Sequence, residues 1–298
     1  MPEPTDTTDR LPRARRPEPP LPLPPGRLVP VPGIGELFVR DTGGDGPVVL
    51  LLHGWMFPSD LNWLQAYGPL SAAGFRVLAM DLRGHGRGLR TAEPFRLQDC
   101  ADDAGALLGA LGVAPALVVG YSMGGPVAQL LARRHPDRVR GLVLCATALA
   151  WDGPYLKTAW NTMGGLRLLL GVFPQGVWRG ALAAARGPQD RRDWVASELS
   201  RGSARDLAEA GRELGRFDST GWAGELPQPS AVVMTTRDRL VRPRRQKDLS
   251  NALGAPIFAV QADHDACATR PREFATALVA ALRSVSGAAT TGLRSVPS

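Results

Sequence analysis

Short apolar segments alternate along this chain with segments whose apolar residues recur at helical spacing, and this alternation limits the choice of fold. The apolar segments are bounded by Gly, Pro or Asp, which is typical of strands buried on both faces. Strands and helices in alternation predict an α/β fold with a mainly parallel sheet, right-handed crossovers and flanking helices. The expected strands are 36–41, 48–53, 75–81, 116–121, 139–146, 230–236 and 256–262, and helical spacing is found in 97–112, 125–136 and 271–284.

The alternation stops between residues 148 and 222. This region has no convincing strand, several helix-like stretches and five tryptophans: Trp151, Trp160, Trp178, Trp194 and Trp222. We expect a helical cap here, inserted into a core formed by residues 28–147 and 223–284. Because such sheets bind ligands at the carboxyl ends of their strands, the cap is expected to cover those ends.

Both ends of the chain are expected to lie outside the fold. Residues 1–27 contain nine prolines and mixed charges with almost no periodic apolar pattern, so they cannot bury enough surface to offset the entropy of ordering. We expect a disordered or polyproline-like tail there. Residues 285–298 are small and polar and are expected to form a flexible tail.

Composition narrows the class of protein further. The chain has 298 residues, of which 44% are apolar, which is enough for a sizeable core. Cys100, Cys145 and Cys267 are odd in number and widely spaced, so neither a disulfide framework nor a zinc site is indicated. No long apolar run occurs, and prolines and charges stand where a signal peptide needs apolar residues. We expect a cytoplasmic protein without stable membrane insertion.

The net charge of +7 does not point to nucleic acid. Residues 237–247, RDRLVRPRRQK, hold much of the excess positive charge in one local patch. Aromatic residues make up only 6% of the chain, and no stacking motif is interleaved with this patch. We therefore expect a small-molecule substrate and no nucleic-acid partner.

A candidate nucleophile lies where an expected strand meets an expected helix, in GYSMGG at residues 120–125. A sharp turn here would force Ser122 toward positive φ, a strained conformation that is tolerated for a function. Gly120 and Gly124 would leave room where side chains would collide with the neighbouring strand and helix. The helix N-terminus would present N–H groups to a developing oxyanion. We interpret Ser122 as a nucleophile.

A serine hydroxyl is a poor nucleophile and needs a base that is itself oriented by a carboxylate. The chain has four histidines. His264, in ADHDA just beyond the last expected strand, is the best candidate base. His53 and His85 follow earlier strands and are expected to bond loop backbone, while His135 is expected at a helix C-terminus.

The candidate acid is Asp238, two residues beyond the expected strand 230–236. It precedes His264 by a gap that fits one helix and one strand. Asp152 is the alternative, because it follows the strand that ends at Ala146. Arginines beside Asp238 would favour its ionised form, provided they do not compete for the carboxylate.

The order Ser122, Asp238, His264 matches the α/β-hydrolase template. The chain resembles the α/β-hydrolase superfamily, in particular bacterial esterase, lipase and haloperoxidase-like hydrolases with a helical cap. The resemblance covers roughly residues 33–283. Its motifs are LLHGW, DLRGHGRG, GYSMGG, HPDRVRGLVL, TTRDRLVRP and the loop at His264.

The resemblance also implies an oxyanion hole. Trp55, which follows the His53-Gly54 motif, is expected to donate one backbone N–H, and Met123 the other. A serine at position 122 argues against dehalogenase and epoxide hydrolase activities, because those subfamilies need an aspartate nucleophile.

Two departures from the family pattern concern the partners of the serine. The histidine stands in Asp263-His264-Asp265 rather than after glycine, which puts the loop geometry in question and would raise the basicity of the imidazole. The acid is flanked by Arg237 and Arg239 instead of small or apolar residues.

Our leading hypothesis is a serine hydrolase that cleaves carboxylic esters through an acyl-enzyme, without a metal or organic cofactor. The tryptophan-rich cap and LLLGVF at residues 168–173 suggest a hydrophobic acyl or alcohol pocket. Hydrolysis of C–C bonds, lactones or amides, or perhydrolysis, are alternatives, because chemistry depends on the pocket rather than the fold. A non-catalytic ligand-binding protein and a membrane-surface protein are further alternatives. The sequence leaves the oligomeric state open.

Overall fold

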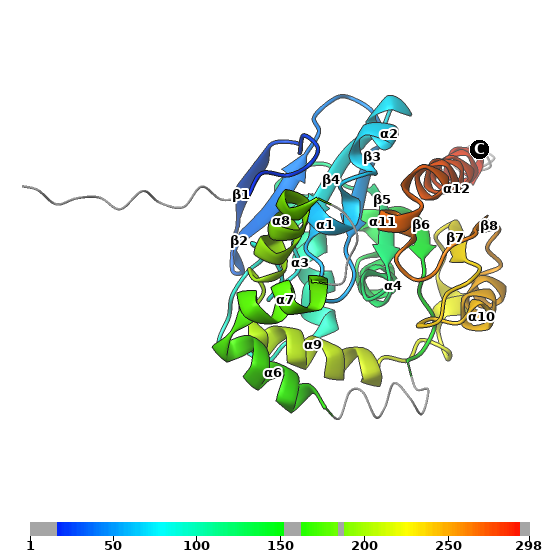
Figure 1. The fold of residues 1–298 in the computed structure, drawn as a ribbon. Helices are drawn as coiled ribbons and strands as arrows, with labels where there is room; N and C mark the ends of the chain where they lie inside the picture. Colours follow the sequence, from blue (N-terminus) through cyan, green and yellow to red (C-terminus); the bar gives the residue numbers. More distant parts are fainter. Residues whose placement is uncertain (1–16, 152–161, 184–187, 293–298) are drawn as a thin grey trace, which may run out of the picture.

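The computed structural model describes residues 17–151, 162–183 and 188–292 (Figure 1). Eight strands form one sheet in the order β1-β2-β4-β3-β5-β6-β7-β8. β1 pairs with β2 and β2 with β4 in antiparallel fashion, and all other pairs are parallel, so the expected α/β fold is confirmed. The strands are β1 Gly26–Val31, β2 Gly35–Asp41, β3 Val48–Leu52, β4 Arg76–Met80, β5 Ala116–Tyr121, β6 Val139–Cys145, β7 Ser230–Thr235 and β8 Ile257–Val260.

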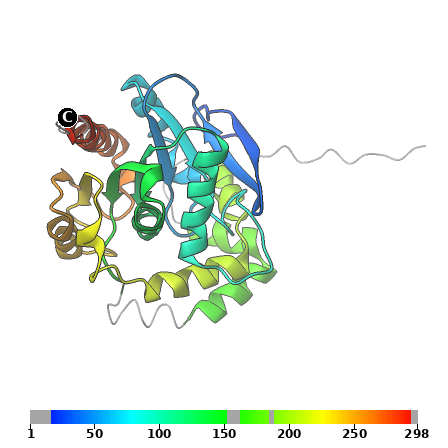
Figure 2. The same cartoon turned by 180° about the vertical axis from the view of Figure 1, so that it is seen from behind.

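Helices cover both faces of the sheet (Figures 1 and 2). Apolar residues of α3 (Leu97–Ala110), α4 (Gly124–Arg134) and α10 (Pro243–Leu253) pack on one face. The other face is covered from α1 (Ser59–Trp63), α2 (Tyr67–Ala72) and α12 (Pro271–Gly292). Strand β5 is buried along its whole length, as its continuous apolar sequence predicts.

Strand β1 crosses the boundary expected between the tail, residues 1–27, and the core. It begins at Gly26 and contains Pro30, which lacks the N–H that a central strand needs. β1 is the edge strand of the sheet, where proline is tolerated, and Val29 and Val31 are buried on the core. The sheet therefore starts at Gly26, two residues before the expected start of the core, because pairing with β2 orders a strand with little pattern of its own.

Helix α12 also passes the boundary expected at residue 285. It continues to Gly292, and Leu282 and Val285 are buried against the sheet, which stabilises the helix beyond its first turns. The short α11 (Ala266–Thr269) precedes it. Within the described ranges, no helix combines the length and apolar character needed to cross a membrane.

The described part of the insertion between β6 and β7 is mainly helical. It contains α6 (Met163–Val172), α7 (Pro174–Leu182), α8 (Gln189–Leu199) and α9 (Ala204–Arg216), and a single antiparallel bridge joins Ala150 to Asp218. Figure 2 shows α9 across the end of α3, with α6 on its outer side. Helix α9 thus separates α6 from the sheet.

Candidate active site

Ser122 occupies the turn between β5 and α4. Its φ is +52°, the positive value expected for a sharp strand-to-helix turn. Its N–H donates to the carbonyl of Cys145 at 2.9 Å, and its carbonyl accepts the N–H of Gly125 at 2.9 Å and the Thr147 hydroxyl at 2.8 Å. These bonds hold the strained backbone in place. Met123 follows as the N-cap residue of α4.

Two glycines make this turn possible. A Cβ on Gly120 would lie 2.3 Å from the carbonyl oxygen of Gly124. A Cβ on Gly124 would lie 2.1 Å from the carbonyl oxygen of Leu52 in β3. Both distances are far below van der Waals contact, so a side chain at either position would collide with backbone atoms.

The structure brings Ser122, His264 and Asp238 into one chain of hydrogen bonds. Nε2 of His264 lies 2.9 Å from Oγ of Ser122, and Nδ1 lies 2.8 Å from Oδ2 of Asp238. An ionised Asp238 can only accept, so Nδ1 carries the proton and the Nε2 lone pair faces the serine hydroxyl. This is the geometry in which an imidazole can take the serine proton.

Asp238 is 3% exposed and is surrounded by donors. Oδ1 accepts the N–H groups of Leu240 at 2.9 Å and Val241 at 2.7 Å. Oδ2 accepts the Thr235 hydroxyl at 2.7 Å and the amide of Gln246 at 3.2 Å, besides the imidazole. These neutral donors stabilise the buried carboxylate without pairing it with a cation.

The arginines beside Asp238 point elsewhere. Arg237 and Arg239 are exposed, and the side chain of Arg239 lies 3.6 Å from the carboxylate of Asp263. In the described structure, the hydrogen-bond partners of the Asp238 carboxylate include His264 but neither arginine side chain. These arginines therefore do not compete with His264 for Asp238.

Asp263 stabilises the backbone of the histidine loop. Its Oδ1 accepts the N–H groups of Arg239 at 2.9 Å and His264 at 2.8 Å, and these two bonds lower the pKa of Asp263. On the other side of the loop, the hydroxyl of Tyr121 donates to the carbonyl of His264 at 2.5 Å. The loop that lacks the family's glycine is thus held by two side chains.

His53 and Asn62 fix the loop that leads to Trp55. Nε2 of His53 accepts the N–H of Leu82 at 2.9 Å, so Nδ1 carries the proton and donates to the carbonyl of Gly54 at 2.8 Å. The N–H of Gly54 donates to Oδ1 of Asn62 at 2.8 Å. Because a trans peptide points its C=O and N–H in opposite directions, the bond to His53 sets the direction of the Trp55 N–H.

Both buried histidines of the early loops are neutral. Burial lowers the pKa of His53 to about 4 and that of His85 to about 3. Nδ1 of His85 lies 2.8 Å from the carbonyl of Arg83, and the two rings lie 5.2 Å apart. As expected, both imidazoles bond loop backbone.

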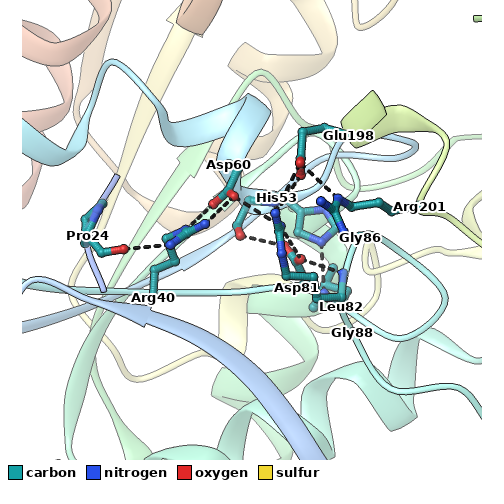
Figure 3. A network of polar contacts seen from close by, with 12 residues as sticks. Pro24, Arg40, His53, Asp60, Asp81, Leu82, Gly86, Gly88, Glu198 and Arg201 are labelled. Atoms are coloured by element: carbon teal, nitrogen blue, oxygen red, sulfur yellow. Dashed lines mark hydrogen bonds and ion pairs between the residues drawn. The ribbon is translucent and has the colours of Figure 1, made fainter. Parts of the chain in front are cut away.

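Buried charges connect this loop region to the insertion (Figure 3). Asp60 pairs with Arg40 at 2.5 and 2.7 Å and with Arg87 at 3.1 Å. Oδ2 of Asp81 accepts the N–H of Arg87 at 2.8 Å. The Arg87 guanidinium also lies 3.1 Å from Glu198 of α8. Arg87 therefore joins two carboxylates of the core to one of the insertion.

Several site residues were absent from the sequence interpretation. Four side chains each form a hydrogen bond with the candidate triad or its loops: Thr235, Gln246, Asn62 and Tyr121. Thr235 and Tyr121 are the last residues of β7 and β5, both of which were expected as strands. Their position at these strand ends was the sequence signal that could have placed them at the site. The alternative acid Asp152 and Trp160 lie outside the described residues.

The segment LLLGVF divides between the core and the surface. Leu168, Leu169, Val172 and Phe173 are exposed, between 53% and 70%, whereas Leu170 is buried. Helix α6 thus turns one apolar face toward α9 and leaves the other in solvent. Trp151 and Trp194 are buried in the structure.

Comparison with known proteins agrees with this fold. A family model described as alpha/beta hydrolase fold matches residues 47–271. A pimeloyl-[acyl-carrier protein] methyl ester esterase of Chromobacterium violaceum is 31% identical over 253 residues, which are 82% of this chain and 96% of that protein. Epoxide hydrolase B of Mycobacterium tuberculosis is 39% identical over 111 residues, only 36% of this chain and 31% of that enzyme.

Among solved structures, an esterase from Exiguobacterium antarcticum superposes with a TM-score of 0.75 at 17% identity, covering 87% of this chain and all of that one. This likeness shows a shared fold. Together with the family model and the esterase of C. violaceum, it establishes that this chain belongs to the α/β-hydrolase family.

Proposed function

We propose that the protein is a serine hydrolase that cleaves carboxylic esters of hydrophobic substrates through an acyl-enzyme. The observation that carries the proposal is the continuous path from Ser122 Oγ through the imidazole of His264 to Asp238, with separations of 2.9 and 2.8 Å. The similar esterase of C. violaceum supports ester substrates.

Acylation begins with attack of Ser122 Oγ on the ester carbonyl carbon while Nε2 of His264 takes the hydroxyl proton. The carbonyl π electrons move to oxygen, and the backbone N–H groups of Trp55 and Met123 are the proposed donors to this oxyanion. When the tetrahedral intermediate collapses, the C–O bond to the alcohol breaks and Nε2–H protonates the leaving oxygen. Each oxyanion donor contributes about 3 kcal/mol in comparable sites.

Deacylation repeats these steps with water. Nε2 takes a proton from water, the oxygen attacks the acyl carbon, and Ser122 Oγ leaves and recovers its proton. Asp238 keeps Nδ1 protonated throughout and stabilises the imidazolium. The products are a carboxylic acid and an alcohol, and no step calls for a metal or organic cofactor.

A serine-reactive phosphonate and p-nitrophenyl esters of increasing chain length test this proposal. We expect the phosphonate on Ser122, higher kcat/KM for longer acyl chains, and loss of turnover in Ser122→Ala. Labelling elsewhere together with full turnover of Ser122→Ala contradicts the mechanism. Labelling of Ser122 without turnover of any ester contradicts the substrate class, and lactones, amides and peracid formation are then the reactions to assay.

The acid is tested by a matched pair of substitutions. Asp238→Asn removes the acceptor that orients Nδ1–H, and kcat is expected to fall by about 10⁴-fold, as for comparable triads. Asp263→Asn alters a half-exposed side chain that bonds only backbone N–H groups and Arg239 in the described structure, and its kcat is expected to change less than about tenfold. Equal losses in the two variants contradict the assignment of Asp238.

A further inference from the structure

The side chain of Trp55 connects the loop at the proposed oxyanion hole to the helical insertion. Its indole Nε1–H donates to the backbone carbonyl of Leu207 in α9 at 2.7 Å. The two residues are 152 positions apart in the chain. Trp55 is half-buried and packs on the apolar core, whereas Leu207 is 1% exposed, so the bond lies in a region of restricted solvent access.

The backbone on the amino side of Trp55 is fixed by the core. Asn62 holds the N–H of Gly54 and His53 holds its carbonyl, as described above. After Trp55 the chain turns sharply, because Met56 has a φ of +67°. The indole bond to Leu207 therefore connects this short loop to α9, a helix of the insertion.

The position of α9 is itself determined by contacts with the core loop at residues 84–95. The N–H of Ser203, the N-cap of α9, donates to the carbonyl of Gly84 at 2.8 Å. Oε2 of Glu209 accepts the N–H of Phe95 at 2.9 Å. At the preceding helix, Glu198 pairs with Arg87 in the charged network of Figure 3. Trp55 thus bonds to a helix, α9, that is also held by these contacts with the core loop.

We propose that Trp55 is a positioning residue that couples the location of α9 to the direction of its own backbone N–H, the proposed oxyanion donor. The proposal rests on the proposed serine hydrolase function. With α9 in place, the indole bond adds a second restraint on this loop to the one that His53 places on the Gly54 carbonyl, and together they hold the N–H toward the developing oxyanion. Displacement of α9 removes the second restraint and weakens binding of the transition state more than binding of the substrate.

Trp55→Phe tests the coupling, because it removes the Nε1–H donor and keeps an aromatic ring. Trp222→Phe is the matched control, since its Nε1–H also donates to a backbone carbonyl, that of Asp218 at 3.3 Å, away from the loop. We expect kcat of Trp55→Phe to fall about tenfold with KM within twofold. The control is expected to keep both values.

The affinity of a trifluoromethyl ketone inhibitor distinguishes the proposed coupling from a merely structural role of Trp55. Its hemiketal with Ser122 places an oxyanion where the proposed N–H donors lie, so Trp55→Phe is expected to weaken the inhibitor about tenfold while KM stays constant. Replacement of Trp55 by β-(3-benzothienyl)alanine, which keeps the ring shape and lacks the N–H, should give the same losses. This second variant decides the matter if the phenylalanine variant folds poorly.

The outcomes separate the coupling from the function. If Ser122 is labelled and the wild type turns over, but both Trp55 variants keep kcat and inhibitor affinity, the coupling is overturned and the hydrolase remains. A rise in KM with kcat unchanged also overturns it, because substrate binding alone is then affected. If the wild type neither labels nor turns over, the proposed function itself fails.

Discussion

Neutral histidines in the core loops couple the stability of this protein to pH. His53 and His85 are fully buried, and burial lowers the pKa of His53 to about 4 and of His85 to about 3. In the unfolded chain both titrate near 6.5. Between these values the unfolded state binds more protons than the folded state, so stability falls as the pH falls.

We therefore expect the free energy of unfolding to decrease from about pH 6.5 downward, by up to about 3 kcal/mol per histidine. Urea denaturation at a series of pH values between 7.5 and 4 measures this. His85→Gln should flatten the profile relative to the wild type, because a glutamine does not titrate. Parallel profiles for the wild type and His85→Gln contradict the burial argument.

At the residue scale, the site also shows why neighbours in sequence are poor guides to neighbours in space. Arg237 and Arg239 flank Asp238 along the chain, yet the carboxylate bonds Thr235, Gln246 and the imidazole. Asp238 lies in the loop three residues beyond the end of β7, where its side chain is buried while the adjacent arginines are exposed. A sequence-adjacent charge acts on a site only if the backbone directs it there.

At the scale of the element, α6 is apolar on two faces. Met163 and Leu170 are buried at 5% and 4%, whereas Leu169 is 53% exposed and Leu168 is 70% exposed. Helical periodicity explains the pair of faces, since residues seven apart share one side. Only the face that meets α9 contributes to the core.

Adjacent leucines of α6 allow a direct test of this assignment. Leu170→Ala should lower the free energy of unfolding by about 2–5 kcal/mol, because it leaves a cavity. Leu169→Ala should change it by less than about 0.5 kcal/mol, because that side chain is largely in solvent. Chemical denaturation of both variants measures the difference, and similar losses at the two positions contradict the orientation of α6.

At the scale of the whole molecule, the insertion and the core are joined by charge. Arg87 contacts Asp60, Asp81 and Glu198, whose side chains are at most 4% exposed. Removing one partner of a buried ion pair leaves an uncompensated charge, which costs more than the pair contributes when intact. This network places the insertion where α9 meets the loop of Trp55.

Arg87→Met is therefore expected to lower the free energy of unfolding by about 3–5 kcal/mol. The double variant Arg87→Met/Glu198→Gln should recover part of this loss, because it also removes the carboxylate of α8. A double-mutant cycle from denaturation curves measures the coupling. Strictly additive effects of the two substitutions contradict a direct connection between core and insertion.

Much of the fold was predictable from the sequence because its signal is local. Seven of the strands follow from continuous apolar segments, and α3, α4 and the start of α12 follow from helical spacing. β1 was missed because a proline-containing edge strand has little pattern of its own. The short α1, α2 and α11 were missed because tertiary packing rather than periodicity stabilises them. A helix between Asp238 and His264 was expected only from the length of that gap, and it is α10.

The sequence by itself determined the fold class and the place of Ser122, since parallel strands end at one edge of the sheet and the glycines around residue 122 allow a turn at positive φ. It also marked Asp238 and His264, which follow strands of the same sheet. Only the tertiary structure decided which donors surround Asp238, which face of α6 is buried and that Trp55 bonds Leu207. These contacts join residues far apart in the chain, so no local pattern of residues specifies them.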